Sequence, residues 1–275
     1  MEFSSEVITL ERVGDVVTLW LDRPAARNAL GSAFWRDLPR ACATIGDDDA
    51  VRVVIIAATG PHFTVGLDLK EYGNFFGGDD ERSSDAVANA RRYESIRAMQ
   101  RSITAVADLP VPVIAAVHGY CIGAGVDLIT ACDIRLSARD ATYSVRETKL
   151  AIVADVGTLQ RLPRIVGAGH VAELALTGKD IDAARAADIG LVNSLHGERA
   201  DDVLGAARDL AREIAANSPL AVRGTKAVLA ANDGRTVTQG LDFVARWNAM
   251  YLDSHDLRET MAAFVDRRTP VFRGD

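Results

Sequence analysis

Cysteine and aromatic residues are scarce in this chain of 275 residues. The three cysteines, Cys42, Cys121 and Cys132, form an odd set without the short spacing of a zinc site or a disulfide framework. We therefore expect no metal and a reducing compartment. Aromatic residues make up only 6% of a chain that is 48% hydrophobic, so the core must be mostly aliphatic. The first residues lack a basic segment followed by an apolar one, so no signal peptide is expected and the sequence predicts a cytoplasmic protein.

An excess of positive charge is also missing. The chain has 38 acidic and 31 basic residues, which gives a net charge of −7, and no lysine or arginine cluster compensates locally. Nucleic-acid-binding proteins usually present a basic face, so this partner class is excluded. The longest uncharged run, residues 109–126, is long enough for a membrane span. It contains two prolines and three glycines, however, and therefore predicts a strand, a turn and a helix start instead of a membrane segment.

The first two-thirds of the chain alternate between expected strands and helices. Strands are predicted at residues 16–21, 51–58, 111–117, 133–137 and 141–145, and helices at 32–45, 91–106 and 126–131. Continuous apolar runs are typical of strands buried on both faces, so the fold class is α/β, with a core over residues 1–197.

Two other parts of the chain have a different composition. Residues 77–86 are rich in glycine, serine and acids and predict a mobile loop. Residues 198–275 are wholly helical in pattern, with apolar positions at helical spacing. Because helices with no sheet to cover often pack against another subunit, we expect an oligomerisation region over residues 198–275.

The segment 113–132 combines a strand, a glycine-rich turn and a helix start. The small residues Gly123, Ala124 and Gly125 let a ligand approach the free N–H groups of the helix start, where negative charge is favoured. Asp127 is the only charged residue of this segment. It could act on a ligand or cap its own helix, and the spacing leaves both interpretations open.

A second turn, residues 62–69, follows the strand that ends near Ala58. Its Gly66 again permits an exposed backbone. Two strand-end turns, each with a bare N–H group, are what an oxyanion hole with two donors requires. Taken alone, the segment favours an ordinary turn between a strand and a helix.

Glu147, which is expected to close the preceding strand, and Asp155 are further candidates for acid–base chemistry. Asp155 is the only charge between residues 150 and 160, and a carboxyl in apolar surroundings either finds hydrogen bonds or has its pKa raised. Alternatively, Glu147 forms a surface ion pair with Arg146 or Lys149, and Asp155 caps a helix. No GxSxG, HExxH or phosphate-loop motif occurs, and the histidines show no metal spacing.

In their order along the chain, these motifs resemble the crotonase (enoyl-CoA hydratase/isomerase) superfamily. The segments that carry the resemblance are residues 16–30, 63–70, 119–135, 158–162 and 264–272. It implies a β-β-α spiral core over residues 1–197 and a helical trimerisation region over 198–275, assembled as a homotrimer or a dimer of trimers. It also implies an acyl-CoA thioester substrate, with CoA as part of the substrate and no separate cofactor or metal.

The resemblance implies roles for individual residues. The N–H groups of Leu67 and Ala124 would bind the thioester oxygen, with Ala124 standing where the family usually has glycine. Residues expected to line the CoA and substrate channel are Ala25, Ala26, Arg27, Val65, Gly66, Asp68 and Leu69. Residues 73–95 are expected to shape the acyl pocket.

The acids point to a subfamily. Hydratases carry glutamate at the positions of both Asp127 and Glu147 and commonly a glycine near Asp155. A chain with all three acids is similar to the Δ3,5-Δ2,4-dienoyl-CoA isomerases of fatty acid β-oxidation. The resemblance implies that Asp155 is the base at C2, Glu147 the acid at C6 and Asp127 a supporting polar partner.

Other functions stay open from the sequence alone. An enoyl-CoA hydratase would use Asp127 and Glu147 to hold water, and an isomerase with a 1,3-shift would use one acid. A dinucleotide-binding oxidoreductase would use the turn at Gly123, but Leu128 occupies the third glycine position of its fingerprint. A scaffold that binds RNA or protein is the alternative outside catalysis, and the negative charge disfavours RNA.

Overall fold

The structure is a computed structural model that describes residues 3–72 and 85–275. The predicted loop at 77–86 and the predicted acyl-pocket segment 73–95 fall partly outside these residues. The strands of the larger sheet, in spatial order, are β1 (Ile8–Val13), β2 (Val16–Leu21), β3 (Val53–Ala58), β4 (Val113–Val117), β6 (Ile134–Ser137) and β9 (Ser194–Leu195). β1 pairs with β2 antiparallel, and all further pairs of this sheet are parallel. A smaller sheet contains β5 (Tyr120–Ile122), β7 (Thr142–Ser144) and β8 (Ile181–Asp182).

The larger sheet is covered by helices on both faces, as its apolar strands predict. On β3, Val53 and Ile55 pack against α8 (Ala200–Ala215), whereas Val54 and Ile56 face the cluster that contains α1 (Ser32–Gly46). Successive strand residues point to opposite faces, so a continuous apolar run is buried on both sides. Together with its C-terminal helices, this architecture confirms the predicted α/β fold class.

The differences from the predicted elements lie mainly around the smaller sheet. The remaining helices are α3 (Asp85–Ala107), α4 (Ala124–Thr130), α5 (Thr158–Arg161), α6 (Ala168–Thr177), α7 (Ala183–Asp188), α9 (Pro219–Ala231), α10 (Val237–Tyr251) and α11 (His255–Asp266). The strand predicted at 141–145 is shorter, and Glu147 does not close it but begins a 3-10 turn, Glu147–Leu150. The glycine-rich turn at 119–123 contains the short strand β5, since pairing with β7 fixes it in extended form.

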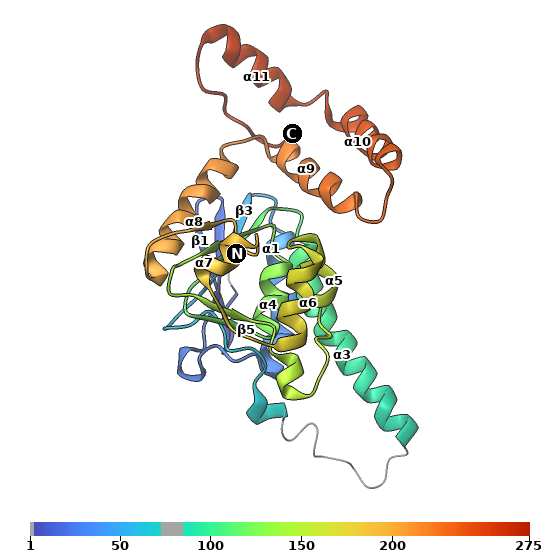
Figure 1. Ribbon diagram of the computed structural model, residues 1–275. Helices are drawn as coiled ribbons and strands as arrows, with labels where there is room; N and C mark the ends of the chain where they lie inside the picture. Colours follow the sequence, from blue (N-terminus) through green and yellow to red (C-terminus); the bar gives the residue numbers. More distant parts are fainter. Residues whose placement is uncertain (1–2, 73–84) are drawn as a thin grey trace.

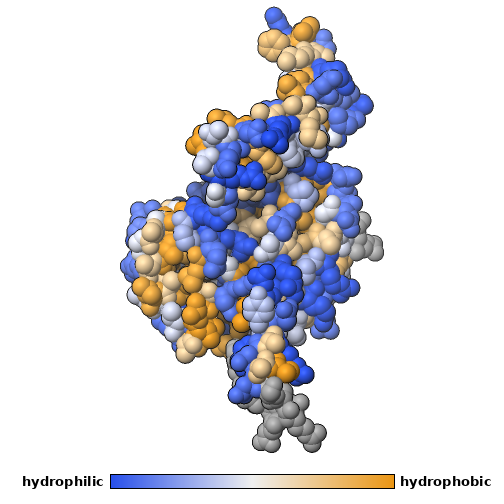
Figure 2. All heavy atoms as spheres, turned by 90° about the vertical axis from the view of Figure 1, so that its right-hand side faces the viewer, coloured by the Kyte–Doolittle hydropathy of each residue, from blue (hydrophilic) through white to orange (hydrophobic). Residues whose placement is uncertain are grey.

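The C-terminal helices form an arm that leaves the body of the molecule (Figure 1). α8 still packs on the sheet, so the arm itself consists of α9, α10 and α11 and begins after the predicted boundary at residue 197. Apolar side chains are exposed on the arm (Figure 2). They include Met250, which is 74% exposed, and Phe264, which is 82% exposed. Among the described residues, no helix is both long and apolar enough to span a membrane.

Candidate active site

Two turns that are far apart in sequence lie side by side at the ends of the strands. Thr64, after β3, forms a parallel bridge with Cys121 of β5. The Thr64 N–H donates to the Tyr120 carbonyl at 2.8 Å, and the Ile122 N–H donates to the Thr64 carbonyl at 3.2 Å. These bonds hold the turn after β3 against the turn that starts α4, the two turns whose sequences suggested the donors of one oxyanion hole.

Gly66 makes the close approach of these turns possible. Its φ is +82°, and a Cβ atom added there would lie 2.5 Å from the Ile122 carbonyl oxygen and 3.5 Å from the Ala124 nitrogen. In the parallel bridge between Leu30 and Leu67, the donors are the N–H groups of Leu30 and Asp68. Ala124 is the first residue of α4. The N–H groups of Leu67 and Ala124 are therefore outside the backbone ladders of this turn.

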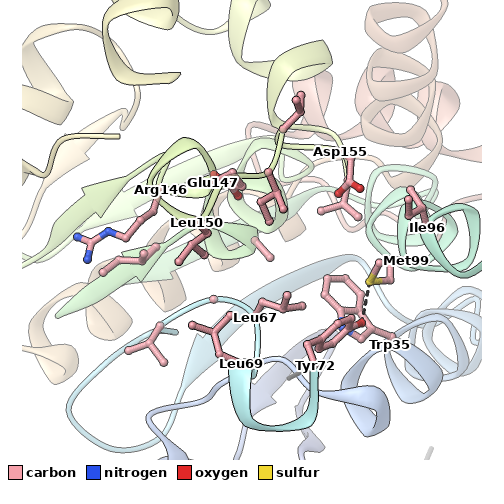
Figure 3. A pocket seen from close by; sticks show the side chains of 18 of the residues that line it. Trp35, Leu67, Leu69, Tyr72, Ile96, Met99, Arg146, Glu147, Leu150 and Asp155 are labelled. Atoms are coloured by element: carbon pink, nitrogen blue, oxygen red, sulfur yellow. Dashed lines mark hydrogen bonds between the residues drawn. The ribbon is translucent and has the colours of Figure 1, made fainter. Parts of the chain in front are cut away.

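A cavity of about 690 Å³ opens beside the two turns (Figure 3). Predicted residues in its wall are Arg27, Val65, Gly66, Leu67, Leu69, Ala124, Glu147 and Asp155. Figure 3 shows the side chains of Glu147 and Asp155 around this space, with Asp155 on the side of Ile96 and Met99. The volume lies within the range of small-molecule sites.

Glu147 is held at the cavity wall by the 3-10 turn that follows β7. It is buried, and its Oε1 lies 3.4 Å from the position of a Cβ added to Gly123, next to Ala124. Its Oε2 has no hydrogen-bond partner among the described residues. Burial, followed by the nearby Asp127, raises the pKa of Glu147 to about 7. Such a carboxyl can give or take a proton near neutral pH.

Asp127 is completely buried behind the cavity wall. Its Oδ1 accepts a hydrogen bond of 2.5 Å from the N–H of Thr158, the first residue of α5, and its Oδ2 has no partner in the described part of the chain. Burial raises the pKa of Asp127 to about 6. Asp127 thus bonds the start of a distant helix instead of its own, and it is not among the residues that line the cavity.

Asp155 lines the cavity from an irregular segment between the 3-10 turn and α5. It does not cap α5, because the residue before that helix is Gly157 and no side-chain cap is present. Partial burial raises the pKa of Asp155 above its ordinary value. The ion pair considered for Glu147 is also absent among the described residues, since Arg146 pairs with Asp180 instead.

Three predicted channel residues are not among those that line the cavity. Ala25 and Ala26 belong to a short 3-10 turn, and neither is among the lining residues. Asp68 is only 6% exposed, and its carboxylate accepts a hydrogen bond of 2.7 Å from Arg23. Its role in the structure is therefore to join two segments by an ion pair, which the local sequence could not reveal.

The sequence reasoning missed the apolar end of the cavity. This end is formed by Trp35 of α1, by Ile96 and Met99 of α3, and by Tyr72, whose hydroxyl lies 2.9 Å from the Met99 sulfur (Figure 3). These side chains are apolar positions of core-facing segments. Only the packing of α1 against α3 turns them toward a cavity.

A group of possible metal ligands lies elsewhere. Among the described residues, His255, Asp256 and Asp275 bring three ligand atoms together in the C-terminal arm. Asp256 already accepts hydrogen bonds from Ser218 at 2.7 Å and from the Arg273 N–H at 2.8 Å. Structural bonds therefore already engage its carboxylate.

Comparisons with known proteins identify the family. Residues 11–275 match the family model described as enoyl-CoA hydratase/isomerase. The chain belongs to this family. This membership confirms the predictions that the protein is an enzyme, that it has the crotonase-like α/β fold and that it resembles the crotonase superfamily.

Several curated relatives that cover most of the chain are named dienoyl-CoA isomerases. The chain is 43% identical over 272 residues to a peroxisomal Delta(3,5)-Delta(2,4)-dienoyl-CoA isomerase of Arabidopsis thaliana, with 97% of this chain and 96% of the relative covered. It is 43% identical to a mitochondrial enzyme of the same name from Dictyostelium discoideum, over 94% of this chain and 87% of the relative. The predicted cytoplasmic location is contradicted by these peroxisomal and mitochondrial relatives. The lack of a secretory signal cannot separate the cytoplasm from these organelles.

Solved structures of the family have the same fold. A putative enoyl-CoA hydratase from Streptomyces coelicolor superposes with a TM-score of 0.89 at 33% identity, covering 98% of this chain and 94% of that one. An enoyl-CoA hydratase from Bacillus anthracis gives 0.88 at 31% identity, covering 98% and 100%.

Proposed function

We propose that this enzyme isomerises 3,5-dienoyl-CoA thioesters to 2,4-dienoyl-CoA thioesters. The observation that carries the proposal is the set of three carboxyls around one cavity: Glu147 and Asp155 in its wall and Asp127 behind it. A hydratase needs carboxyls to hold one water molecule, whereas moving two conjugated double bonds requires proton transfer at two separated carbons. The names of the relatives from Arabidopsis thaliana and Dictyostelium discoideum support the same substrate class.

The thioester oxygen would accept hydrogen bonds from the N–H groups of Leu67 and Ala124. The position of Gly66 near the Ala124 nitrogen supports this pairing. Removing a proton from C2 leaves a dienolate whose negative charge is concentrated on this oxygen, so donors placed in advance stabilise it. Arg27, also in the cavity wall, would contact the CoA part of the substrate.

The proton transfers follow from the protonation states of the acids. An ionised Asp155 takes the proton from C2, electrons shift through the dienolate, and a protonated Glu147 gives a proton to C6. The pKa of Glu147, raised to about 7, supports its role as the acid at neutral pH. Asp127 supports that protonated state, because its charge next to Glu147 opposes ionisation.

One structural observation favours the opposite assignment, with Glu147 acting at C2 and Asp155 at C6. Glu147 lies beside Gly123, directly before the Ala124 N–H, which would bring its carboxyl close to C2. Exchange of the C2 hydrogen with deuterated solvent, followed by mass spectrometry of the dienoyl thioester, separates the two assignments. With Asp155 as the base at C2, Glu147→Gln retains this exchange and Asp155→Asn loses it. The reverse result would assign C2 to Glu147.

The proposed activity itself is tested on two substrates. Purified enzyme is given a 3,5-dienoyl-CoA and crotonyl-CoA, and conversion is followed by absorbance and mass spectrometry. We expect the 2,4-dienoyl product to form much faster than crotonyl-CoA is hydrated. Fast hydration without isomerisation would instead support the hydratase alternative, in which Asp127 and Glu147 hold water.

We also propose that the C-terminal arm assembles the protein into a homotrimer or a dimer of trimers. The exposed apolar side chains of the arm, such as Leu241, Met250 and Phe264, support this assembly because large exposed apolar surfaces usually mark interfaces. Sedimentation equilibrium should give three or six times the mass of one chain. A monomer at micromolar concentration would contradict the assembly.

A further inference from the structure

The segment that carries Asp155 has little backbone support of its own. Within the described part of the chain, residues 153–156 belong to no helix or strand, and none of them makes a backbone–backbone hydrogen bond. A carboxyl on such a segment moves unless side chains fix it. Catalytic groups need placement within a fraction of an ångström, so these fixing side chains matter for the reaction.

Helix α3 provides this support from one face. Gln100 donates a hydrogen bond of 2.6 Å from its Nε2 to the backbone carbonyl of Asp155. Thr104, one turn further along, accepts a bond of 3.0 Å from Arg161, which also contacts the Val156 carbonyl at 3.5 Å. Residues four positions apart share a helix face, so one face of α3 bonds the Asp155 carbonyl directly and reaches the Val156 carbonyl through Arg161.

Arg97 determines how the Gln100 amide is oriented. Its Nη1 donates a hydrogen bond of 2.7 Å to the Gln100 Oε1. A guanidinium can only donate, so the amide oxygen must face Arg97 and the amide NH₂ is directed to Asp155. Arg97 and Gln100 therefore form a relay that ends on the backbone of Asp155.

We propose that Gln100 is a positioning residue of the enzyme, which fixes Asp155 against the substrate cavity through its backbone carbonyl, with Arg97 orienting the Gln100 amide. The proposal rests on the proposed isomerase function of this cavity. The same helix contributes Ile96 and Met99 to the cavity wall, so one rigid element positions both the acyl chain and Asp155. Gln100 itself is not among the residues that line the cavity.

The test compares Gln100→Leu with a matched control, Gln160→Leu. Gln160 lies on α5 near the same segment, but its side chain makes no hydrogen bond among the described residues. A displacement of about 1 Å can cost on the order of 100-fold in rate. We expect Gln100→Leu to lower kcat by about 10- to 100-fold with KM changed less than about twofold, because ground-state binding is untouched. Arg97→Leu should lower kcat less, and Gln160→Leu should match the parent enzyme.

Hydrogen–deuterium exchange gives a readout that does not depend on activity. The N–H groups of Ile152 and Thr158, which are hydrogen-bonded at the two ends of the segment, should exchange faster in Gln100→Leu than in the parent or in Gln160→Leu, since the segment loses its tie to α3. Unchanged exchange would overturn the proposal, and so would a rise in KM at constant kcat. A parent enzyme without isomerase activity but with the expected exchange difference would refute the proposed function and leave the contact between α3 and the segment standing.

Discussion

The approach of the two turns at Gly66 gives the sharpest test of how this site is built. In Gly66→Ala, the new methyl group would lie 2.5 Å from the Ile122 carbonyl oxygen and 3.3 Å from its carbon. Both are backbone atoms, so a side-chain rotation cannot relieve the contact. The turns must separate, which displaces the N–H groups of Leu67 and Ala124 from each other.

The expected magnitude has two parts. The φ of +82° costs an L-residue about 1–2 kcal/mol in the left-handed region, which lowers stability whatever the surroundings. The backbone contact adds displacement of the N–H pair. Loss of one oxyanion donor costs about 10²–10³-fold in kcat, so we expect a decrease of that size in isomerisation.

The assay measures kcat with a 3,5-dienoyl-CoA together with the thermal unfolding midpoint. Gly14→Ala is the matched control, because Gly14 has a φ of +64° and nothing lies within 4 Å of an added Cβ atom. Gly14→Ala therefore has the conformational cost of a positive φ without a steric contact, at a residue that does not line the cavity. We expect Gly14→Ala to lower the unfolding midpoint slightly and to keep the kcat of the parent enzyme.

The two variants together separate strain from chemistry. Parental kcat in a folded Gly66→Ala enzyme would refute the assignment of the N–H pair. An equal loss of activity in Gly14→Ala would attribute the effect to instability instead of to the displaced donors.

Further predictions concern the buried acids. Asp127→Asn keeps an acceptor oxygen for the Thr158 N–H but removes the charge that, after burial, raises the pKa of Glu147. If Glu147 must be protonated, activity falls as pH rises through its pKa, so this variant should move the alkaline limb of the kcat profile to lower pH, and an unmoved limb would contradict the coupling. In the arm, Asp256→Ala leaves the Ser218 hydroxyl and two backbone N–H groups without their acceptor. This should destabilise the arm by about 1–3 kcal/mol, measured by hydrogen exchange of α11, and unchanged protection would refute it.

Local patterns were sufficient to predict much of the fold. Residues 16–21 form β2 with the predicted bounds, and the run at 51–58 contains β3, because buried β-branched residues leave few alternatives. The first strand, β1, was not predicted. The second half of this strand, Glu11 to Val13, is exposed, so its hydropathy pattern does not mark it as a strand. Pairing with β2 determines its extended conformation instead.

The candidate site was likewise only partly predictable from the sequence. The acids could be found because Asp127 and Asp155 are isolated charges in apolar segments and Glu147 lies just after a predicted strand. Their partners could not be found, since Asp127 bonds Thr158, 31 residues further along. Gln100 likewise reaches a carbonyl 55 residues away, and no local spacing encodes such contacts.

The central claim is that this cavity moves double bonds instead of adding water. The most direct measurement is the ratio of kcat/KM for a 3,5-dienoyl-CoA to that for crotonyl-CoA in the parent enzyme, with products identified by mass spectrometry. The arrangement of Asp127, Glu147 and Asp155 predicts a product of unchanged mass, the 2,4-dienoyl thioester, and a ratio well above one. A product heavier by one water from crotonyl-CoA, with the 3,5-dienoyl thioester left unconverted, would contradict it.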